Sequence, residues 1–319
     1  MCTAISYQTT HHYFGRNLDL ERGYQEQVVI TSRSYPLFFR FVKPQKQHYA
    51  MIGMAAVVNE YPLYFEATNE MGLSMAGLNF PKNAIYQEYE EGKENIAPFE
   101  LIPYLLGKYS SVREVKDALR VINVVHCNFS DELPVSPLHW MISDKEESIT
   151  LECTKDGMKV YDNPFGVLTN NPTFEYHLMN MNNYMGIWEG AAKNTVCPQI
   201  PLENYSLGLG ALGLPGDFSS NSRFIKTVFV KEKSVCNGSE MESVNQFFHI
   251  LQAVAMPKGC VLTPEGEYEY TRYSCCCNTD RQIYYYTTYE NPMIQKADMH
   301  EVDLDGTRLI TKRQNDIGE

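Results

Sequence analysis

The order of strand-like and helix-like patterns along the chain is the feature that most restricts its fold. Runs rich in β-branched and aromatic residues occupy residues 2–80, 138–170 and 268–299, and helical patterns lie between these blocks. Strands and helices do not alternate singly, as parallel βαβ units require. The sequence therefore predicts an α+β protein in which two antiparallel sheets are sandwiched between helical layers. No internal repeat or linker occurs, so a single domain over residues 1–319 is expected.

Individual elements follow from hydrophobic periodicity and turn residues. Strands are predicted over 2–8, 13–20, 25–33, 49–58, 63–72, 73–80, 138–144, 148–154, 158–162, 166–170, 268–278, 283–290 and 293–299. Helices are predicted over 98–108, 173–184, 222–233 and 241–256, and one more starts at the Ser111–Glu114 capping box, with apolar Val115, Leu119 and Val121 behind it. His11 and His12 are expected in a solvated turn. A loop at 59–62 is expected to expose Tyr61, Leu63, Tyr64 and Phe65 as a binding wall, or to fold onto its own side chains.

Charge and cysteine usage exclude several function classes. The formal net charge is -12 and no basic cluster offsets it, which argues against nucleic acid and anionic membranes as partners. No run of eighteen apolar residues and no signal-peptide pattern occurs, so we expect a cytoplasmic protein. Nine cysteines without metal-ligand spacing predict neither disulfides nor a metal site. Residues 275–277 are three consecutive cysteines, which cannot converge on one ion from a strand, so buried free thiols are expected there. No cofactor is expected.

The N-terminal residues carry the strongest chemical hypothesis. If an aminopeptidase removes Met1, Cys2 holds both a thiol and a free α-amino group. Their reference pKa values, about 8.5 and about 7.7 to 8.0, make proton transfer between them nearly thermoneutral. Arg16 and Asp19 follow closely, the first suited to stabilise a thiolate and the second to hold an ammonium. Cys2 alone is weak evidence, because cysteine at position two is not rare.

Residues 187–217 form an irregular segment that ends in a glycine- and leucine-rich run. The segment is too long for an ordinary connection within a compact domain. We expect a lid or an arm used in oligomer assembly.

Six separated motifs then occur in one order between Cys2 and about Asp303. They are Cys2-Thr3 with Phe14-Gly15-Arg16-Asn17-Leu18-Asp19, Ala67-Thr68-Asn69-Glu70-Met71-Gly72-Leu73, Ala76-Gly77-Leu78-Asn79-Phe80-Pro81, Leu138-His139-Trp140, Gly166-Val167-Leu168-Thr169-Asn170-Asn171-Pro172, and Leu214-Pro215-Gly216-Asp217 with Ser222-Arg223-Phe224. This set resembles the choloylglycine hydrolase family, and more closely its conjugated bile salt hydrolases of gut bacteria.

The resemblance implies an N-terminal nucleophile hydrolase with a four-layer αββα sandwich. It implies a homotetramer, in which residues 187–217 resemble the family's assembly loop. Cys2 would be the nucleophile and its α-amino group the base, Arg16 would favour the thiolate, and Asp19 would orient the amine. Asn79 and Asn170 match the oxyanion-hole asparagines, and Arg223 completes the polar set.

The resemblance also suggests the substrate. Asparagine at position 79 is similar to the bile-salt branch, whereas penicillin V acylases of this type commonly carry tyrosine there. The positions that match the steroid-facing wall are Leu18, Val58, Phe65, Phe129 and Leu133, with core packing as the alternative for each. We therefore expect hydrolysis of glycine- and taurine-conjugated bile salts. Penicillin V or N-acyl homoserine lactone acylase activity and non-catalytic bile-acid binding are the alternatives.

Overall fold

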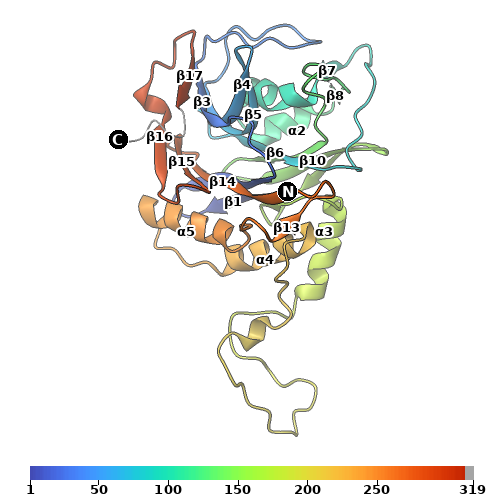
Figure 1. Cartoon of the computed structure of the whole chain (residues 1–319), viewed down its shortest axis with the longest axis vertical. Coiled ribbons are helices and arrows are strands. Elements are labelled where there is room, and N and C mark those ends of the chain that lie inside the picture. The colour runs from blue at the N-terminus through green and yellow to red at the C-terminus, as the bar shows by residue number, and fades with distance from the viewer. Residues whose placement is uncertain (313–319) are drawn as a thin grey trace.

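Two antiparallel sheets lie face to face and carry helices on their outer sides in the computed structural model, which describes residues 1–312 (Figure 1). The first sheet has the order β12-β1-β2-β14-β15-β16, with β13 paired to β14; its strands are β1 (Cys2–Gln8), β2 (His12–Leu20), β12 (Val167–Leu168), β13 (Val261–Leu262), β14 (Tyr268–Asn278), β15 (Ile283–Thr288) and β16 (Gln295–Asp298). The predicted four-layer αββα architecture is confirmed. Residues 313–319, which the expected domain includes, lie outside the described residues.

The second sheet has the order β11-β10-β9-β6-β5-β4-β3-β17. Its strands are β3 (Gln27–Thr31), β4 (Met51–Val58), β5 (Tyr61–Asn69), β6 (Ser74–Asn79), β9 (Leu138–Ser143), β10 (Ser148–Thr154), β11 (Gly157–Asp162) and β17 (Leu309–Lys312). A short parallel pair, β7 (Glu94–Ile96) with β8 (Ile122–Val124), stands apart from both sheets and was not predicted. Such three-residue strands carry too little periodicity to be recognised in a sequence.

Helices α1 (Leu101–Lys108) and α2 (Val112–Ala118) bury their apolar side chains in one core cluster with the second sheet. Helices α4 (Ser220–Lys233) and α5 (Glu240–Gln252) pack on the first sheet, and α3 (Phe174–Met181) packs beside α4. The predicted cap is confirmed in part: the Ser111 side chain accepts from Glu114 N, but the Glu114 carboxylate bonds to Ser110. Val121 is 49% exposed because α2 ends before it, contrary to the apolar-face prediction.

Two local expectations about turns need correction, the first only for His12, because His11 lies in the turn and is partly exposed. His12 is 1% exposed and begins strand β2, where its ring bonds to Ser6 and Thr279. The β4–β5 turn comprises only Asn59 and Glu60, both at positive φ, so β5 already begins at Tyr61. A two-residue turn of this kind suits the twist of the flanking strands and leaves no loop to fold into a wall. The aromatic residues of this region are therefore strand residues.

Each of the two large sheets contains a β-bulge. Strand β5 shifts register against β4 between the Met54–Glu66 and Ala55–Tyr64 pairs, which leaves Phe65 as the extra residue. Strand β14 shifts against β2 between Thr271 and Tyr273. Bulges re-aim side chains and are frequent beside active sites. The β5 bulge presents the Phe65 carbonyl to Arg16, and the β14 bulge lies opposite Leu18 and Asp19.

Residues 187–217 project from the body as an arm, between α3 and α4 (Figure 1). Its two limbs are joined by Trp188 N to Gly210 O at 3.0 Å and by Gly210 N to Gly190 O at 2.9 Å. Further out, Asn204 bonds to both backbone groups of Ala192. The arm is thus a projecting loop whose two limbs are hydrogen-bonded to each other, and it does not pack over the sheets.

Candidate active site

Cys2 lies at the start of β1, which runs between the edge strand β12 and β2 in the first sheet. It pairs with Leu18 of β2, which in turn pairs with Tyr273 of β14, and its side chain is only 2% exposed. Its backbone nitrogen donates to Asn170 Oδ1 at 2.8 Å. Because side chains alternate along a strand, Cys2 shares with Ala4 the face opposite to that of Thr3.

Arg16 is completely buried and occupies the diagonal position from Cys2, since it pairs with Ala4. Its Nη1 donates to the carbonyls of Gly77 at 2.6 Å and Phe65 at 3.1 Å. Its Nη2 has no hydrogen-bond partner within residues 1–312. Burial alone lowers the pKa of Arg16, but the facing Cys2, Tyr273 and Glu66 raise it overall, so the guanidinium is a fixed positive charge.

Asp19 faces the helical layer and not the space between the sheets. One carboxylate oxygen accepts from Thr271 Oγ1 at 2.6 Å. The other, Oδ2, lies 4.0 Å from Arg223 Nη1 and has no hydrogen-bond partner among the described residues. A buried carboxylate oxygen without a donor is costly. It marks a position where an additional donor is expected.

Arg223 of α4 and Asn170 link these groups. The Arg223 guanidinium donates to Cys2 O, to Thr3 Oγ1 at 2.7 Å and to Asn170 Oδ1 at 2.7 Å. Burial lowers the pKa of Arg223, while Asp19 and Cys2 oppose the shift. Asn170 Nδ2 donates to Asn79 O at 2.7 Å. The structure therefore brings together all six residues that the sequence singled out for catalysis: Cys2, Arg16, Asp19, Asn79, Asn170 and Arg223.

Asn170 is held by residues that the sequence analysis missed. Its backbone nitrogen donates to Ser220 Oγ at 2.8 Å, and its carbonyl contacts His177 Nε2 at 3.1 Å. Burial lowers the pKa of His177 to about 4, so the ring is neutral near neutral pH. Neither residue carries a sequence signal, because an isolated serine or histidine on a helix has no distinctive spacing. Only the packing of α3 and α4 reveals their role.

Met1 still covers the Cys2 nitrogen in this chain. Its amino group donates to Asp19 O at 2.6 Å and pairs with Glu269, and Asp19 N donates to Met1 O at 2.9 Å. Burial lowers the pKa of the Met1 amino group, against the opposing charges of Cys2 and Asp19. The methionine is thus accommodated as an extension of β1, directly beside the candidate nucleophile.

The five expected substrate-wall positions differ in their exposure. Leu18 is 3% exposed and belongs to the same buried cluster as Cys2. Phe65 and Val58 are half-buried, and Phe65 lies 6.3 Å from the Tyr24 ring. Phe129 belongs to an aromatic cluster with Tyr61 and Phe99, at 5.9 and 5.2 Å. The loop that holds Phe129 closes on itself through Phe129 N to Leu133 O at 3.1 Å.

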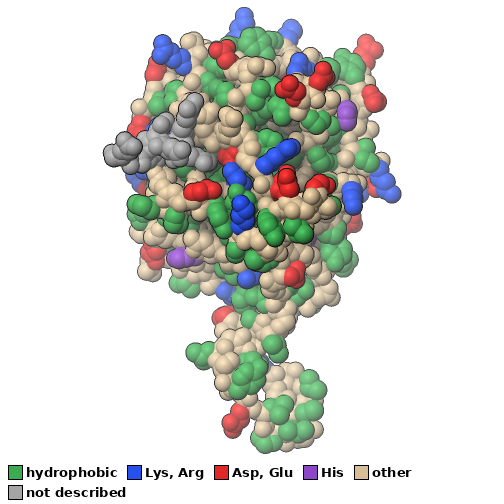
Figure 2. Space-filling model, viewed as in Figure 1, with side chains coloured by type: hydrophobic (Ala, Val, Ile, Leu, Met, Phe, Trp, Pro, Cys, Tyr) green, Lys and Arg blue, Asp and Glu red, His purple; other side chains and the backbone are tan. Residues whose placement is uncertain are grey.

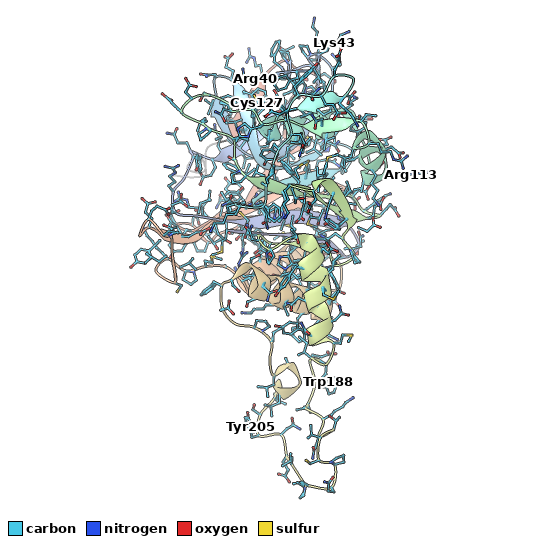
Figure 3. The ribbon with its side chains drawn as sticks, turned by 90° about the vertical axis from the view of Figure 1, so that its right-hand side faces the viewer. Arg40, Lys43, Arg113, Cys127, Trp188 and Tyr205 are labelled. Atoms are coloured by element: carbon cyan, nitrogen blue, oxygen red, sulfur yellow. The ribbon has the colours of Figure 1, made fainter. Side chains whose placement is uncertain are left out.

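Arg40 extends this aromatic cluster at the molecular surface. It is exposed, lies within 6.0 Å of the Phe99 and Phe129 rings and donates to Phe129 O at 2.7 Å. Figure 3 shows Arg40 next to Cys127, on the side of the molecule away from the arm. The sequence analysis did not select Tyr61, Phe99 and Arg40 as one group, because three separate segments contribute them.

One cavity of the described chain lies away from the predicted site residues. Within residues 1–312, no three His, Cys, Asp or Glu side chains are arranged to hold a metal ion, and no helix is long and apolar enough to cross a membrane. A cavity of about 830 Å³ is lined by Arg33, Lys43, Glu70 and Lys108 among others, and by none of the predicted site residues. Arg33 and Lys108 already pair there with Glu70 and Glu94.

Comparisons with known proteins agree with the geometry. Residues 2–312 match the family model described as linear amide C–N hydrolases, choloylglycine hydrolase family. The bile salt hydrolase/transferase of Lactiplantibacillus plantarum is 52% identical over 98% of this chain and 96% of its own length. The crystal structure of the C2A mutant of conjugated bile acid hydrolase from Clostridium perfringens superposes with a TM-score of 0.91 at 38% identity, covering 99% and 97% of the two chains. Penicillin V acylase from Agrobacterium tumefaciens shares the fold, with a TM-score of 0.73 at 20% identity over 95% and 88%.

Proposed function

The chain belongs to the choloylglycine hydrolase family of linear amide C–N hydrolases, and on this premise we propose that it hydrolyses glycine- and taurine-conjugated bile salts with Cys2 as nucleophile. The observation that carries the mechanism is the buried Asp19 Oδ2, which has no hydrogen-bond donor within residues 1–312 and lies 4.0 Å from the Arg223 guanidinium that also bonds to Cys2 O and Asn170. Removal of Met1 turns the Cys2 amide nitrogen into an ammonium or amine. That group supplies the donor that the Asp19 carboxylate lacks.

In this mechanism the α-amine of Cys2 takes the thiol proton, and the sulfur attacks the amide carbonyl. Arg16, with its free Nη2, stabilises the thiolate. The Asn170 side chain and Asn79 donate to the tetrahedral oxyanion; Nδ2 of Asn170 has two hydrogens and uses one on Asn79 O. The α-ammonium protonates the leaving amine, and water attacks the thioester with the α-amine as base again.

The substrate assignment rests on the relatives and on the apolar positions. The Lactiplantibacillus plantarum and Clostridium perfringens relatives are named for bile salts, and both match over nearly the whole chain. Phe65, Val58, Phe129 and Leu133 are at least partly accessible, as residues of a steroid-binding wall must be. The same relatives are also named as transferases, so we propose that an amine can replace water in the second step. Penicillin V remains the alternative substrate, because the acylase named for it shares the fold.

We propose that the active unit is a cytoplasmic homotetramer of single-domain subunits from a gut bacterium. The arm exposes large apolar side chains, with Val196 at 88%, Tyr205 at 85% and Leu207 at 100% (Figure 2). Apolar groups on a projecting segment require a partner, and further copies of this chain supply one. All nine cysteines are free, as is usual in a reducing compartment.

Release of glycine or taurine tests the proposal. Purified protein is first examined by mass spectrometry for loss of Met1, and is then incubated with glycocholate, taurocholate or penicillin V while the released amine is measured. We expect turnover of both bile salts in excess of penicillin V, and none in Cys2→Ala, which retains the fold. Preference for penicillin V would overturn the substrate assignment. Undiminished activity in Cys2→Ala, or full activity in protein that retains Met1, would overturn the mechanism. Steroid binding without turnover in the processed protein would favour the bile-acid-binding alternative.

A further inference from the structure

A second buried carboxylate lies behind Arg16. Glu66 of β5 is 2% exposed and points from the second sheet into the space between the sheets. Its Oε2 accepts from Tyr273 OH at 2.7 Å, and its Oε1 accepts from Tyr284 OH at 2.6 Å and Met54 N at 3.2 Å. Burial raises the pKa of this carboxyl, while Arg16 and the three donors oppose the shift. Three donors converging on two oxygens are the pattern that an ionised carboxylate requires. A purely structural glutamate at this depth would be unfavourable compared with an apolar residue.

Glu66 also interacts electrostatically with Arg16. Its Oε2 lies 3.9 Å from Arg16 Nε, on the side of the guanidinium that is not occupied by the carbonyls of Gly77 and Phe65. The Phe65 bulge fixes this geometry, because it presents the Phe65 carbonyl and the Glu66 side chain to Arg16 from adjacent residues. The carboxylate and the guanidinium are therefore held at a defined separation, independently of substrate.

Glu66 adds a buried anion close to Arg16. Arg16 and Arg223 are two buried cations, whereas Asp19 is the one buried anion that the sequence analysis identified. With Glu66 ionised, the four charges cancel. The thiolate and α-ammonium that form together in the first step then add no net charge. Without Glu66, Arg16 would lose the carboxylate that lies 3.9 Å from its Nε, and its positive charge would act more strongly on the reacting sulfur and amine.

We propose that Glu66 is a positioning residue that acts on Cys2 through Arg16, partly neutralising the guanidinium and so setting the pH range in which the Cys2 thiolate forms. The inference rests on the proposed function only in taking Cys2 as the nucleophile. The other titratable groups that face Glu66 are Tyr273 and Cys275 of β14, Cys277 of the same strand, and Tyr284 of β15. Burial raises the pKa values of all four, so they stay neutral across the working range and Glu66 is the anion of this group.

Alkylation of Cys2 measures the effect without any substrate. The processed protein is treated with iodoacetamide across a pH series, and modification of the N-terminal peptide is followed by mass spectrometry. Glu66→Gln keeps the shape and removes the negative charge, which favours the thiolate and disfavours the ammonium. We expect the inflection for Cys2 to move down by about half a pH unit or more, and the acid limb of the turnover profile to move with it.

Glu100→Gln is the matched control. Glu100 is also a buried carboxylate, at 1% exposure, and accepts from backbone nitrogens of Ala97 and Arg40 in the other core cluster. The Glu100→Gln variant is expected to show the Cys2 inflection at the same pH as the wild type. Tyr284→Phe removes one hydrogen-bond donor to Glu66 and should shift the Cys2 inflection downward by a smaller amount. This variant replaces Glu66→Gln in the test if Glu66→Gln does not fold. An unchanged inflection in folded Glu66→Gln, or in folded Tyr284→Phe in its place, overturns the inference. Failure of the proposed function would instead appear as wild-type protein that alkylates at Cys2 but releases no amine.

Discussion

Replacing Asn170 with aspartate separates the catalytic role of its amide from its structural role. The Asn170 Oδ1 accepts from Cys2 N at 2.8 Å and from Arg223 Nη2 at 2.7 Å, and an aspartate oxygen can keep both contacts. What the substitution removes is the Nδ2 donor, which bonds to Asn79 O at 2.7 Å and is proposed to stabilise the oxyanion. Asn170→Asp therefore deletes a donor and introduces a negative charge where negative charge develops.

The two consequences differ in size. The lost bond to Asn79 O costs about 0.5 to 1.5 kcal/mol of folding free energy, and the new charge pair with Arg223 offsets part of it. Loss of one oxyanion donor costs about 2.7 to 4 kcal/mol of transition-state stabilisation, which is a fall of about 100- to 1,000-fold in kcat/KM. The aspartate charge adds to this loss. Activity should thus fall far more than stability.

Asn171→Asp is the control in the adjacent residue. Its Nδ2 donates to a backbone carbonyl, Pro81 O, also at 2.7 Å, but no bond joins its side chain to Cys2 or Arg223. We expect kcat/KM within about threefold of wild type for this variant. Bile salt hydrolysis is assayed together with urea unfolding for both proteins. An Asn170→Asp enzyme whose kcat/KM stays within tenfold of the Asn171→Asp enzyme would refute the oxyanion role.

Three further outcomes follow from the structure. Burial lowers the pKa values of His12 and His177 to about 4, so the unfolded chain binds more protons than the folded chain between about pH 6.5 and 4. The free energy of unfolding should therefore fall as the pH drops through this window, by at most about 3 kcal/mol per histidine. Urea unfolding of His12→Gln should show a weaker dependence of this free energy on pH than the wild type, and parallel dependences would contradict the assignment. Phe224→Ala should lower the free energy of unfolding by about 3 to 5 kcal/mol in the same measurement, because the ring is fully buried against His177 and Phe174. Leu207→Ala on the arm, at 100% exposure, should change the free energy of unfolding of the dissociated chain by no more than about 0.5 kcal/mol. Equal effects of the two substitutions would contradict the assigned burial. Ala192 and Asn204 of the arm already bond to each other, so residues 193–203 can be replaced by a short glycine linker between them (Figure 3 shows Trp188 and Tyr205 on the arm). This deletion should reduce the mass of the assembly measured by light scattering and leave the circular dichroism spectrum unchanged. An unaltered mass would argue against assembly through the arm.

Most of the fold follows from local periodicity. Strands such as β1, β2 and β14 are predicted to within a residue or so, because alternation and turn residues are properties of short segments. The errors fall where a tertiary contact overrides local pattern. His12 is polar and lies beside a turn, yet the hydroxyls of Ser6 and Thr279 satisfy its ring inside the protein. The sequence of a histidine does not record which hydroxyls will meet it.

The candidate catalytic residues are found from the sequence because each belongs to a contiguous motif. Cys2, Arg16, Asp19, Asn79, Asn170 and Arg223 can be selected without knowing which of them touch. Only the folded chain shows that, with Met1 attached, Cys2 N donates to Asn170, and that one Asp19 oxygen has no donor within residues 1–312. The substrate wall is less predictable, because Leu18 is buried in the core and Phe129 joins rings from two other segments.

Fold class, family and the candidate catalytic residues can all be read from the sequence, since these depend on local pattern and on motifs of a few residues. The charge balance around Cys2 depends instead on the packing of the two sheets. Glu66 lies fifty positions from Arg16 with no motif of its own, and it reaches Arg16 only because a bulge in one sheet turns it toward the other. Electrostatic interactions act through space between groups of any sequence separation. Their balance around Cys2 is therefore a property of the packed sheets and not of any one segment.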